Sequence, residues 1–293
     1  MMNLKGELVS FISKDKLILN GFLFHSTQPS KGVIIHIHGM TGSFYDTFTM
    51  NIATRFAKSG FDFFPINTRG ANKVESFEGE GRRKDETIGT VFEDFKKCIY
   101  DIEGAIDFCR KRGYKKIVLQ GHSTGCQKIT YYQAVKNDKR VSALILLAPA
   151  DDINLARKKF GKKLPIMIKI AKRLLKKKHP YQRLMPFGIY GGLISAERFL
   201  SFADEKNAEA QLFDYIEGKL SLFRKIRIPI LAIFGSKEQY RTMPVAKYLE
   251  MLRNATKSKK FNSLKIKGAN HSFGKTERIL VERILNWLEN LES

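Results

Sequence analysis

Apolar residues along the chain fall into runs of two kinds, and these runs alternate. Short, nearly continuous apolar runs are typical of strands that are covered on both faces of a sheet. Longer runs with apolar residues three and four positions apart indicate helices that bury one face. After residue 30 the pattern predicts strands at 33–38, 61–66, 116–120, 141–147, 228–234 and 261–266. It predicts helices at 46–58, 89–112, 244–252 and 276–291, and another that begins at Ser123.

The beginning of the chain has a different rhythm. Residues 8–12 and 17–24 alternate apolar and polar side chains, which predicts two antiparallel strands. The alternation of strands and helices that follows predicts an α/β fold with a mostly parallel sheet flanked by helices. This pattern stops after Pro149 and resumes at Ile228. We therefore expect a core made of residues 1–150 and 226–293, with residues 151–225 inserted as a helical lid.

Composition narrows the class of protein. The chain has 293 residues, of which 43% are hydrophobic, and no apolar run approaches the ~20 residues needed to cross a bilayer. The start of the chain does not resemble a secretory signal, so we expect a cytoplasmic protein. Its three cysteines, Cys98, Cys109 and Cys126, are too few and too irregularly spaced for a disulfide framework or a zinc site.

The first motif that indicates catalysis is Gly121-His122-Ser123-Thr124-Gly125, which follows a predicted apolar strand and begins a predicted helix. A tight turn between strand and helix can expose a serine hydroxyl to a base that takes its proton. The nucleophile then lies in a strained conformation, so the positions two before and two after it must be small. Gly121 and Gly125 meet this requirement.

A nucleophilic serine needs a general base and an acid that orients the base. Of the six histidines, only His271 lies in a loop between the last strand and the last helix, where it can reach back to Ser123. Glu238 lies three residues beyond Gly235, which ends a strand. Asp152 and Asp151, after the strand at 141–147, offer an alternative acid or cap the next helix.

With the order Ser123, Glu238, His271, the chain resembles the serine hydrolases of the α/β-hydrolase superfamily, over residues 31–149 and 228–293. The resemblance implies an α/β-hydrolase fold and an esterase or lipase-like activity, with no cofactor or metal. It also implies an oxyanion hole formed by the backbone amides of Thr124 and Met40. His38 is expected to hold this loop by a hydrogen bond.

Carboxylic esters are the expected substrates, and Met40, Phe44 and the apolar side of the lid suggest an apolar, lipid-like acyl group. Thioesters and amides remain alternatives because they use the same groups. A protein of another class, a non-catalytic binding protein on the same scaffold, is a further alternative. The complete set of serine, acid and histidine argues against it.

The net charge of +23 is concentrated in the inserted segment, where twelve basic residues and no acidic residue lie between Arg157 and Arg183. Residues 165–178 form an amphipathic helix in projection, which we expect to roof the active site while its lysines face solvent. Two other interpretations are contact with an anionic membrane and recruitment of acidic substrates. These cations could also bind a polyanion, but a nucleic acid is disfavoured. Binding of a single strand uses aromatic side chains placed among the basic ones, and this stretch has only Phe160 and Tyr181.

Overall fold

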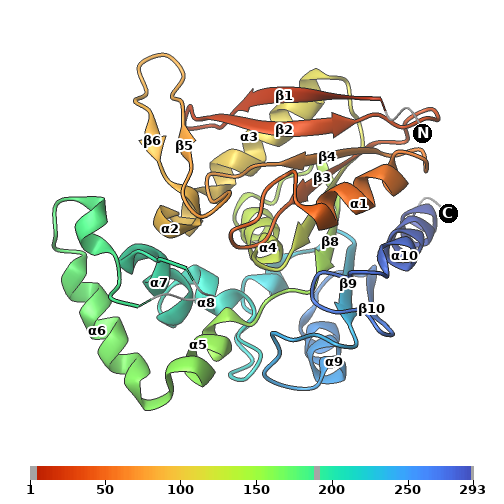
Figure 1. Ribbon diagram of the computed structural model, residues 1–293. Helices are drawn as coiled ribbons and strands as arrows, with labels where there is room; N and C mark the ends of the chain where they lie inside the picture. Colours follow the sequence, from red (N-terminus) through yellow and green to blue (C-terminus); the bar gives the residue numbers. More distant parts are fainter. Residues whose placement is uncertain (1–4, 188–191, 292–293) are drawn as a thin grey trace.

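The structure is a computed structural model that describes residues 5–187 and 192–291. Residues 1–4, 188–191 and 292–293, which belong to the predicted core and insertion, lie outside the described residues. Eight strands of the described chain form one sheet in the order β1-β2-β4-β3-β7-β8-β9-β10 (Figure 1). Their bounds are β1 Gly6–Ile12, β2 Ile18–Phe24, β3 Val33–Ile37, β4 Asp62–Ile66, β7 Ile117–His122, β8 Val141–Leu147, β9 Ile230–Gly235 and β10 Phe261–Ile266.

The six strands β4, β3, β7, β8, β9 and β10, in this order across the sheet, are parallel. The β1–β2 and β2–β4 pairs are antiparallel. This confirms the predicted antiparallel pair at the start of the chain and the mostly parallel sheet that follows. A short hairpin of β5 (Ser76–Phe77) and β6 (Glu86–Thr87) lies outside this sheet and was not predicted.

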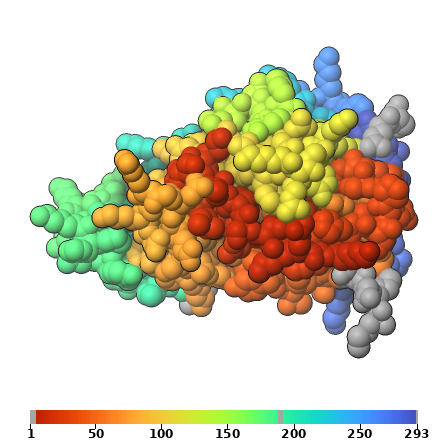
Figure 2. Space-filling view, turned by 90° about the horizontal axis from the view of Figure 1, so that it is seen from above, coloured from red at the N-terminus to blue at the C-terminus, as the bar shows by residue number. Residues whose placement is uncertain are grey.

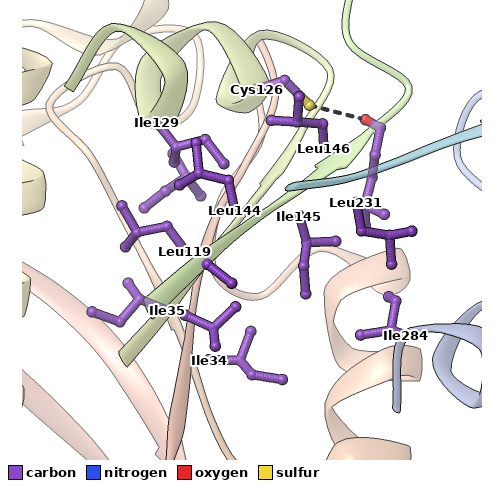
Figure 3. Packing of buried hydrophobic residues seen from close by; sticks show 14 of the residues in the cluster. Ile34, Ile35, Leu119, Cys126, Ile129, Leu144, Ile145, Leu146, Leu231 and Ile284 are labelled. Atoms are coloured by element: carbon purple, nitrogen blue, oxygen red, sulfur yellow. Dashed lines mark hydrogen bonds between the residues drawn. The ribbon is translucent and has the colours of Figure 1, made fainter. Parts of the chain in front are cut away.

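Helices cover both faces of the sheet. On one face α3 (Cys98–Lys111) packs beside α4 (Thr124–Lys136), while α1 (Thr47–Phe56) packs with α10 (Glu277–Glu289). Strand side chains alternate between the two layers: Leu144 lies toward Ile129 of α4, and Ile145 lies toward Ile284 of α10 (Figure 3). The near-continuous apolar runs in the sequence follow from this two-sided burial.

Between β8 and β9 the chain leaves the sheet and forms several short helices, which we call the inserted segment (residues 151–225). They are α5 (Asp152–Phe160), η2 (Gly161–Lys163), α6 (Leu164–Leu174), η3 (Pro180–Arg183), α7 (Ala196–Ala203), α8 (Ala208–Leu212) and η4 (Phe223–Lys225). Part of the segment has its own apolar cluster, in which α6 packs on α7 (Figure 1). No helix in the described part of the chain is long and apolar enough to cross a membrane.

The prediction of a single helix at 89–112 is wrong, because the helix is interrupted after its first turn. Helix α2 (Gly89–Phe92) ends at Glu93, whose backbone is extended, and η1 (Phe95–Lys97) leads into α3. The Glu93 carboxylate turns inward to pair with Lys128 at 2.6 Å and with Arg198 at 3.6 Å. All three side chains are buried, so the ion pairs that tie α4 to the inserted segment override the helical periodicity.

The remaining core elements agree with their predictions to within a few residues. The carboxyl end of β9 leads through Pro244 into α9 (Val245–Ala255), and α10 closes the chain against α1. Because the strands from β4 onward are parallel, their carboxyl ends meet at one edge of the sheet. The loops at this edge carry the groups described next.

Candidate active site

Ser123 occupies the turn between β7 and α4, with φ 54° and ψ −123°. This conformation is rare for a residue with a side chain and costs of order 1–3 kcal/mol, so the surrounding structure must hold it. The Ser123 amide donates to the carbonyl of Leu147 in β8 at 2.9 Å, which fixes the turn against the neighbouring strand. The side chain remains partly exposed at the edge of the sheet.

The glycines on either side of the turn are required by close backbone contacts. A Cβ on Gly121 would lie 2.4 Å from the carbonyl carbon of Gly125, and a Cβ on Gly125 would lie 2.2 Å from the carbonyl oxygen of Ile37. Gly39, in the loop after β3, approaches Ser123 in the same way, since its Cβ would lie 3.0 Å from the Cβ of Ser123. The spacing of glycines around the serine therefore has a steric cause.

His271 and Glu238 are brought together from two loops at the same edge of the sheet. The Nδ1–H of His271 donates to the Glu238 carboxylate, at 2.8 Å to Oε1 and 2.9 Å to Oε2. Glu238 also accepts from the backbone amide of Tyr240 at 2.9 Å, and the His271 amide donates to Oε1 of Gln239 at 2.7 Å. With Nδ1 bound to the acid, Nε2 of His271 is the ring nitrogen available to exchange a proton.

The two aspartates considered as alternative acids have other partners. Asp151 is buried and accepts from the hydroxyl of Thr242 at 2.6 Å and from Nδ2 of Asn154 at 2.7 Å. Burial raises the pKa of its carboxyl to about 6. Asp152 accepts from Nε2 of Gln127 at 2.8 Å. Asp151 lies at the N-cap of α5 without a capping hydrogen bond, so the capping role predicted from the sequence is wrong for this residue.

The two residues whose amides are implied as an oxyanion hole line the same cavity. Thr124 is the first residue of α4, so its N–H is one of the helix amides without an acceptor inside the helix. Met40 follows Gly39 in the β3 loop and lines the cavity with Thr124. The next amide, that of Thr41, donates to Oγ1 of Thr90 at 2.8 Å, which fixes the loop just beyond Met40.

The loop that carries Met40 rests on a buried polar network. Nδ1–H of His38 donates to the carbonyl of Gly39 at 2.8 Å, as predicted, and Nε2 accepts from the amide of Thr68 at 3.2 Å. The Thr68 hydroxyl accepts from Nζ of Lys128 at 2.9 Å. Burial, aided by the Lys128 charge, lowers the pKa of His38 to about 4. His38 is therefore a neutral structural support.

The Asn67-to-Gly70 loop supports this side of the site through hydrogen bonds to neighbouring loops. Arg69 is buried and donates to Asp101 at 2.7 Å and to Asp15 at 2.7 Å, while Oδ1 of Asn67 accepts from the amide of Phe44 at 2.8 Å. Desolvation works against the charge of Arg69, but its two acidic partners outweigh it and raise the pKa of the guanidinium.

His122, which directly precedes Ser123, also contacts the site. Its Nε2–H donates to the carbonyl oxygen of His271 at 2.9 Å, and the two rings are 5.0 Å apart. Burial, followed by the nearby His271, lowers the pKa of His122 to about 3, so this ring is neutral. A histidine beside the serine was visible in the sequence, but its partner lies 149 residues away.

The side chains border a cavity of about 600 Å³. Its lining includes Ser123, His271 and Met40, and the inserted segment contributes Asp152 and Leu155. Phe44, predicted to border the substrate, instead lines a separate hollow with Tyr45 and Asn67. Among residues 5–187 and 192–291, no group of three or more histidine, cysteine, aspartate or glutamate side chains is arranged to hold a metal ion.

The helix expected to roof this cavity does not line it. None of the described cavity-lining residues belongs to α6, whose Met167, Ile168 and Ile170 pack against a buried cluster that includes Phe199 of α7. Met40, which lines the cavity, packs against the same cluster. Ile166 of α6 is 57% exposed. Cys126, three residues beyond Ser123, is fully buried in α4, and burial raises the pKa of its thiol.

The match to a known protein family extends from residue 18 to residue 289. The chain belongs to the family described as "Protein of unknown function (DUF1749)". Over 115 residues it is 31% identical to a Mycoplasma pneumoniae protein named "Putative esterase/lipase 2". That match covers 39% of this chain and 37% of the relative, so the two correspond over little more than a third of their lengths.

Solved structures of the α/β-hydrolase fold resemble the chain over nearly its whole length. A monoglyceride lipase from Saccharomyces cerevisiae, in complex with a substrate analogue, has a TM-score of 0.70 at 16% identity and covers 99% of this chain and 96% of its own. Est1E from Butyrivibrio proteoclasticus, with bound ferulic acid, has a TM-score of 0.63 at 18% identity, with 97% and 99% covered. The predicted α/β-hydrolase fold is confirmed.

Proposed function

We propose that this protein is a serine hydrolase that cleaves carboxylic esters through an acyl-serine intermediate. The observation that carries the proposal is that His271, hydrogen-bonded to Glu238, lines the same cavity as Ser123, which occupies a strained turn. The family relative named as an esterase or lipase and the esterase and lipase structures of the same fold support it.

In the proposed reaction, Nε2 of His271 takes the proton of the Ser123 hydroxyl as Oγ attacks the ester carbonyl. The amides of Met40 and Thr124 donate to the oxyanion. The intermediate collapses when the bond to the alcohol breaks, and Nε2–H gives its proton to the departing alkoxide. Water then loses a proton to Nε2 and attacks the acyl group; release of the acid returns the proton to Oγ. Glu238 holds the ring and stabilises its transient positive charge.

The charges around the cavity favour an uncharged substrate. Asp46, Asp152 and Glu277 line it, and its described lining residues include no lysine or arginine, although the chain carries a net charge of +23. Carboxylates in the lining oppose the close approach of anionic substrates. This favours neutral esters over thioesters of polyanionic carriers and does not support recruitment of acidic substrates.

An apolar acyl group is the better fit to the same walls. Met40, Phe48, Leu155 and Tyr240 supply apolar surface beside Ser123 and His271, within a volume suited to a small or medium-sized ligand. We therefore propose short to medium acyl chains on a neutral alcohol. Amide hydrolysis by the same groups is the second candidate activity. Comparison of an ester with an anilide substrate distinguishes the two.

The test is a panel of p-nitrophenyl esters from acetyl to palmitoyl, assayed with the wild type and with Ser123→Ala, alongside butyryl-coenzyme A and butyryl anilide. We expect hydrolysis of neutral esters, an optimum at short or medium chains, and loss of activity in Ser123→Ala. Covalent labelling of the wild type by a fluorophosphonate, absent from Ser123→Ala, reports the nucleophile without a substrate. Failure of the wild type to label would favour a non-catalytic binding protein.

A further inference from the structure

The stretch from the end of α5 to the turn after α6 is rich in cations that form no ion pair with a described residue. Of the twelve basic residues between Arg157 and Arg183, Arg157 pairs with Asp214, Lys172 pairs with Asp204, and Arg183 pairs with Glu197. Eight others are exposed or nearly so and form no ion pair within the described part of the chain: Lys158, Lys162, Lys163, Lys169, Arg173, Lys176, Lys177 and Lys178.

An exposed apolar side chain lies among these cations. Ile166 is 57% exposed, and Lys169 and Arg173 lie three and seven residues after it, which places these three side chains on one side of α6. Lys162, also exposed, lies in η2 directly before the helix. Leu175 and Tyr181, 38% and 65% exposed, add apolar surface beyond the end of α6. We call Ile166, Lys162, Lys169 and Arg173 the α6 ridge.

The ridge is held in place by the rest of the inserted segment. The inward face of α6, with Ala171 fully buried, packs on α7. Beyond the helix, the guanidinium of Arg183 donates to the carbonyl of Lys177 at 2.7 Å. Figures 1 and 2 show α6 projecting at one end of the molecule, away from α10. The packed apolar face of α6 is thus not available to a membrane, and the opposite face is exposed.

We propose that the α6 ridge docks the protein on an anionic phospholipid surface. Phospholipid headgroups of negative charge match the unpaired cations, each of which contributes about 1 kcal/mol near such a surface. Ile166 enters the boundary between headgroups and acyl chains, where an exposed aliphatic side chain finds an apolar environment. A nucleic acid backbone offers no such environment to Ile166, so the combination of charges and isoleucine favours a membrane. This inference is independent of the proposed ester hydrolysis.

The test is co-sedimentation with vesicles of phosphatidylcholine alone and with vesicles containing about 30% phosphatidylglycerol, at low and high salt. We expect the wild type to bind the anionic vesicles at least about tenfold more tightly than the neutral ones. Lys169→Gln/Arg173→Gln should weaken this binding about 25-fold, since each lost cation costs about fivefold. Ile166→Ser should also weaken it, and its deficit should persist at high salt.

A matched control removes the same charge elsewhere. Lys247 in α9 and Lys257 just after it are exposed, so Lys247→Gln/Lys257→Gln changes the net charge equally and should leave vesicle binding within about twofold of the wild type. Equal losses in the two double variants, or no preference of the wild type for anionic vesicles, would overturn the proposal. The proposal would also be overturned if Ile166→Ser bound vesicles as tightly as the wild type and duplex DNA displaced the wild type from vesicles. That result would assign the ridge to nucleic-acid binding.

Discussion

The imidazole of His271 donates its Nδ1–H to both carboxylate oxygens of Glu238, at 2.8 and 2.9 Å. Glu238 follows β9 and His271 follows β10, so adjacent parallel strands deliver the pair to one edge of the sheet. Both side chains are more than nine-tenths buried, which shields the pair from water.

We expect Glu238→Gln to lower kcat for ester hydrolysis by roughly 10³- to 10⁴-fold, because a neutral amide cannot stabilise the imidazolium and favours the wrong tautomer. Asp152→Asn and Asp151→Asn should stay within a few-fold of the wild type, since their carboxylates bond to Gln127 and Thr242. Steady-state kinetics on the three variants checks this. A larger loss in Asp152→Asn than in Glu238→Gln would transfer the acid role to Asp152.

Ser123→Gly should be more stable to urea than Ser123→Ala by about 1 kcal/mol, although both variants lack the hydroxyl. The reason is the backbone at this position, with φ 54° and ψ −123°, which glycine adopts without the clash of a Cβ. Unfolding midpoints at equal slope measure the difference. Equal midpoints would mean that the turn stores no strain.

His122→Phe should lower kcat by about 10- to 100-fold with little change in KM, because the ring no longer donates to the His271 carbonyl and the catalytic ring shifts. His122→Gln keeps a donor and should recover part of the loss. Since the pKa of His122 is about 3, the wild-type pH profile above pH 5 should contain no titration of this residue. A loss confined to KM, or no recovery in His122→Gln, would exclude a positioning role.

Asp151 should make the folded state less stable as the pH rises from about 4 to 6. Its pKa is raised from 3.8 to about 6, so in this window the folded state binds more protons than the unfolded state, and the free energy of unfolding falls with pH. A shift of about two units corresponds to at most roughly 3 kcal/mol. Asp151→Asn cannot titrate, so urea unfolding should show its stability improving relative to the wild type between pH 4.5 and 7. An unchanged difference at the two pH values would contradict this prediction.

The sequence by itself determined the order and type of the core elements, because burial on both faces of a parallel sheet leaves continuous apolar runs such as 141–147. It also indicated the turn at Ser123 through Gly121 and Gly125, since the steric need for small residues is local. The break at Glu93 was not visible, because its cause is a pair of buried cations on α4 and α7.

Only the tertiary structure decided which distant groups meet. It brought Glu238 to His271, gave Asp151 and Asp152 other partners, and set His122 against the His271 carbonyl. It also turned the apolar side of α6 toward α7 and left Ile166 exposed beside Lys169 and Arg173. Periodicity predicts that a helix has a buried side, but the neighbouring element selects which residues that side contains.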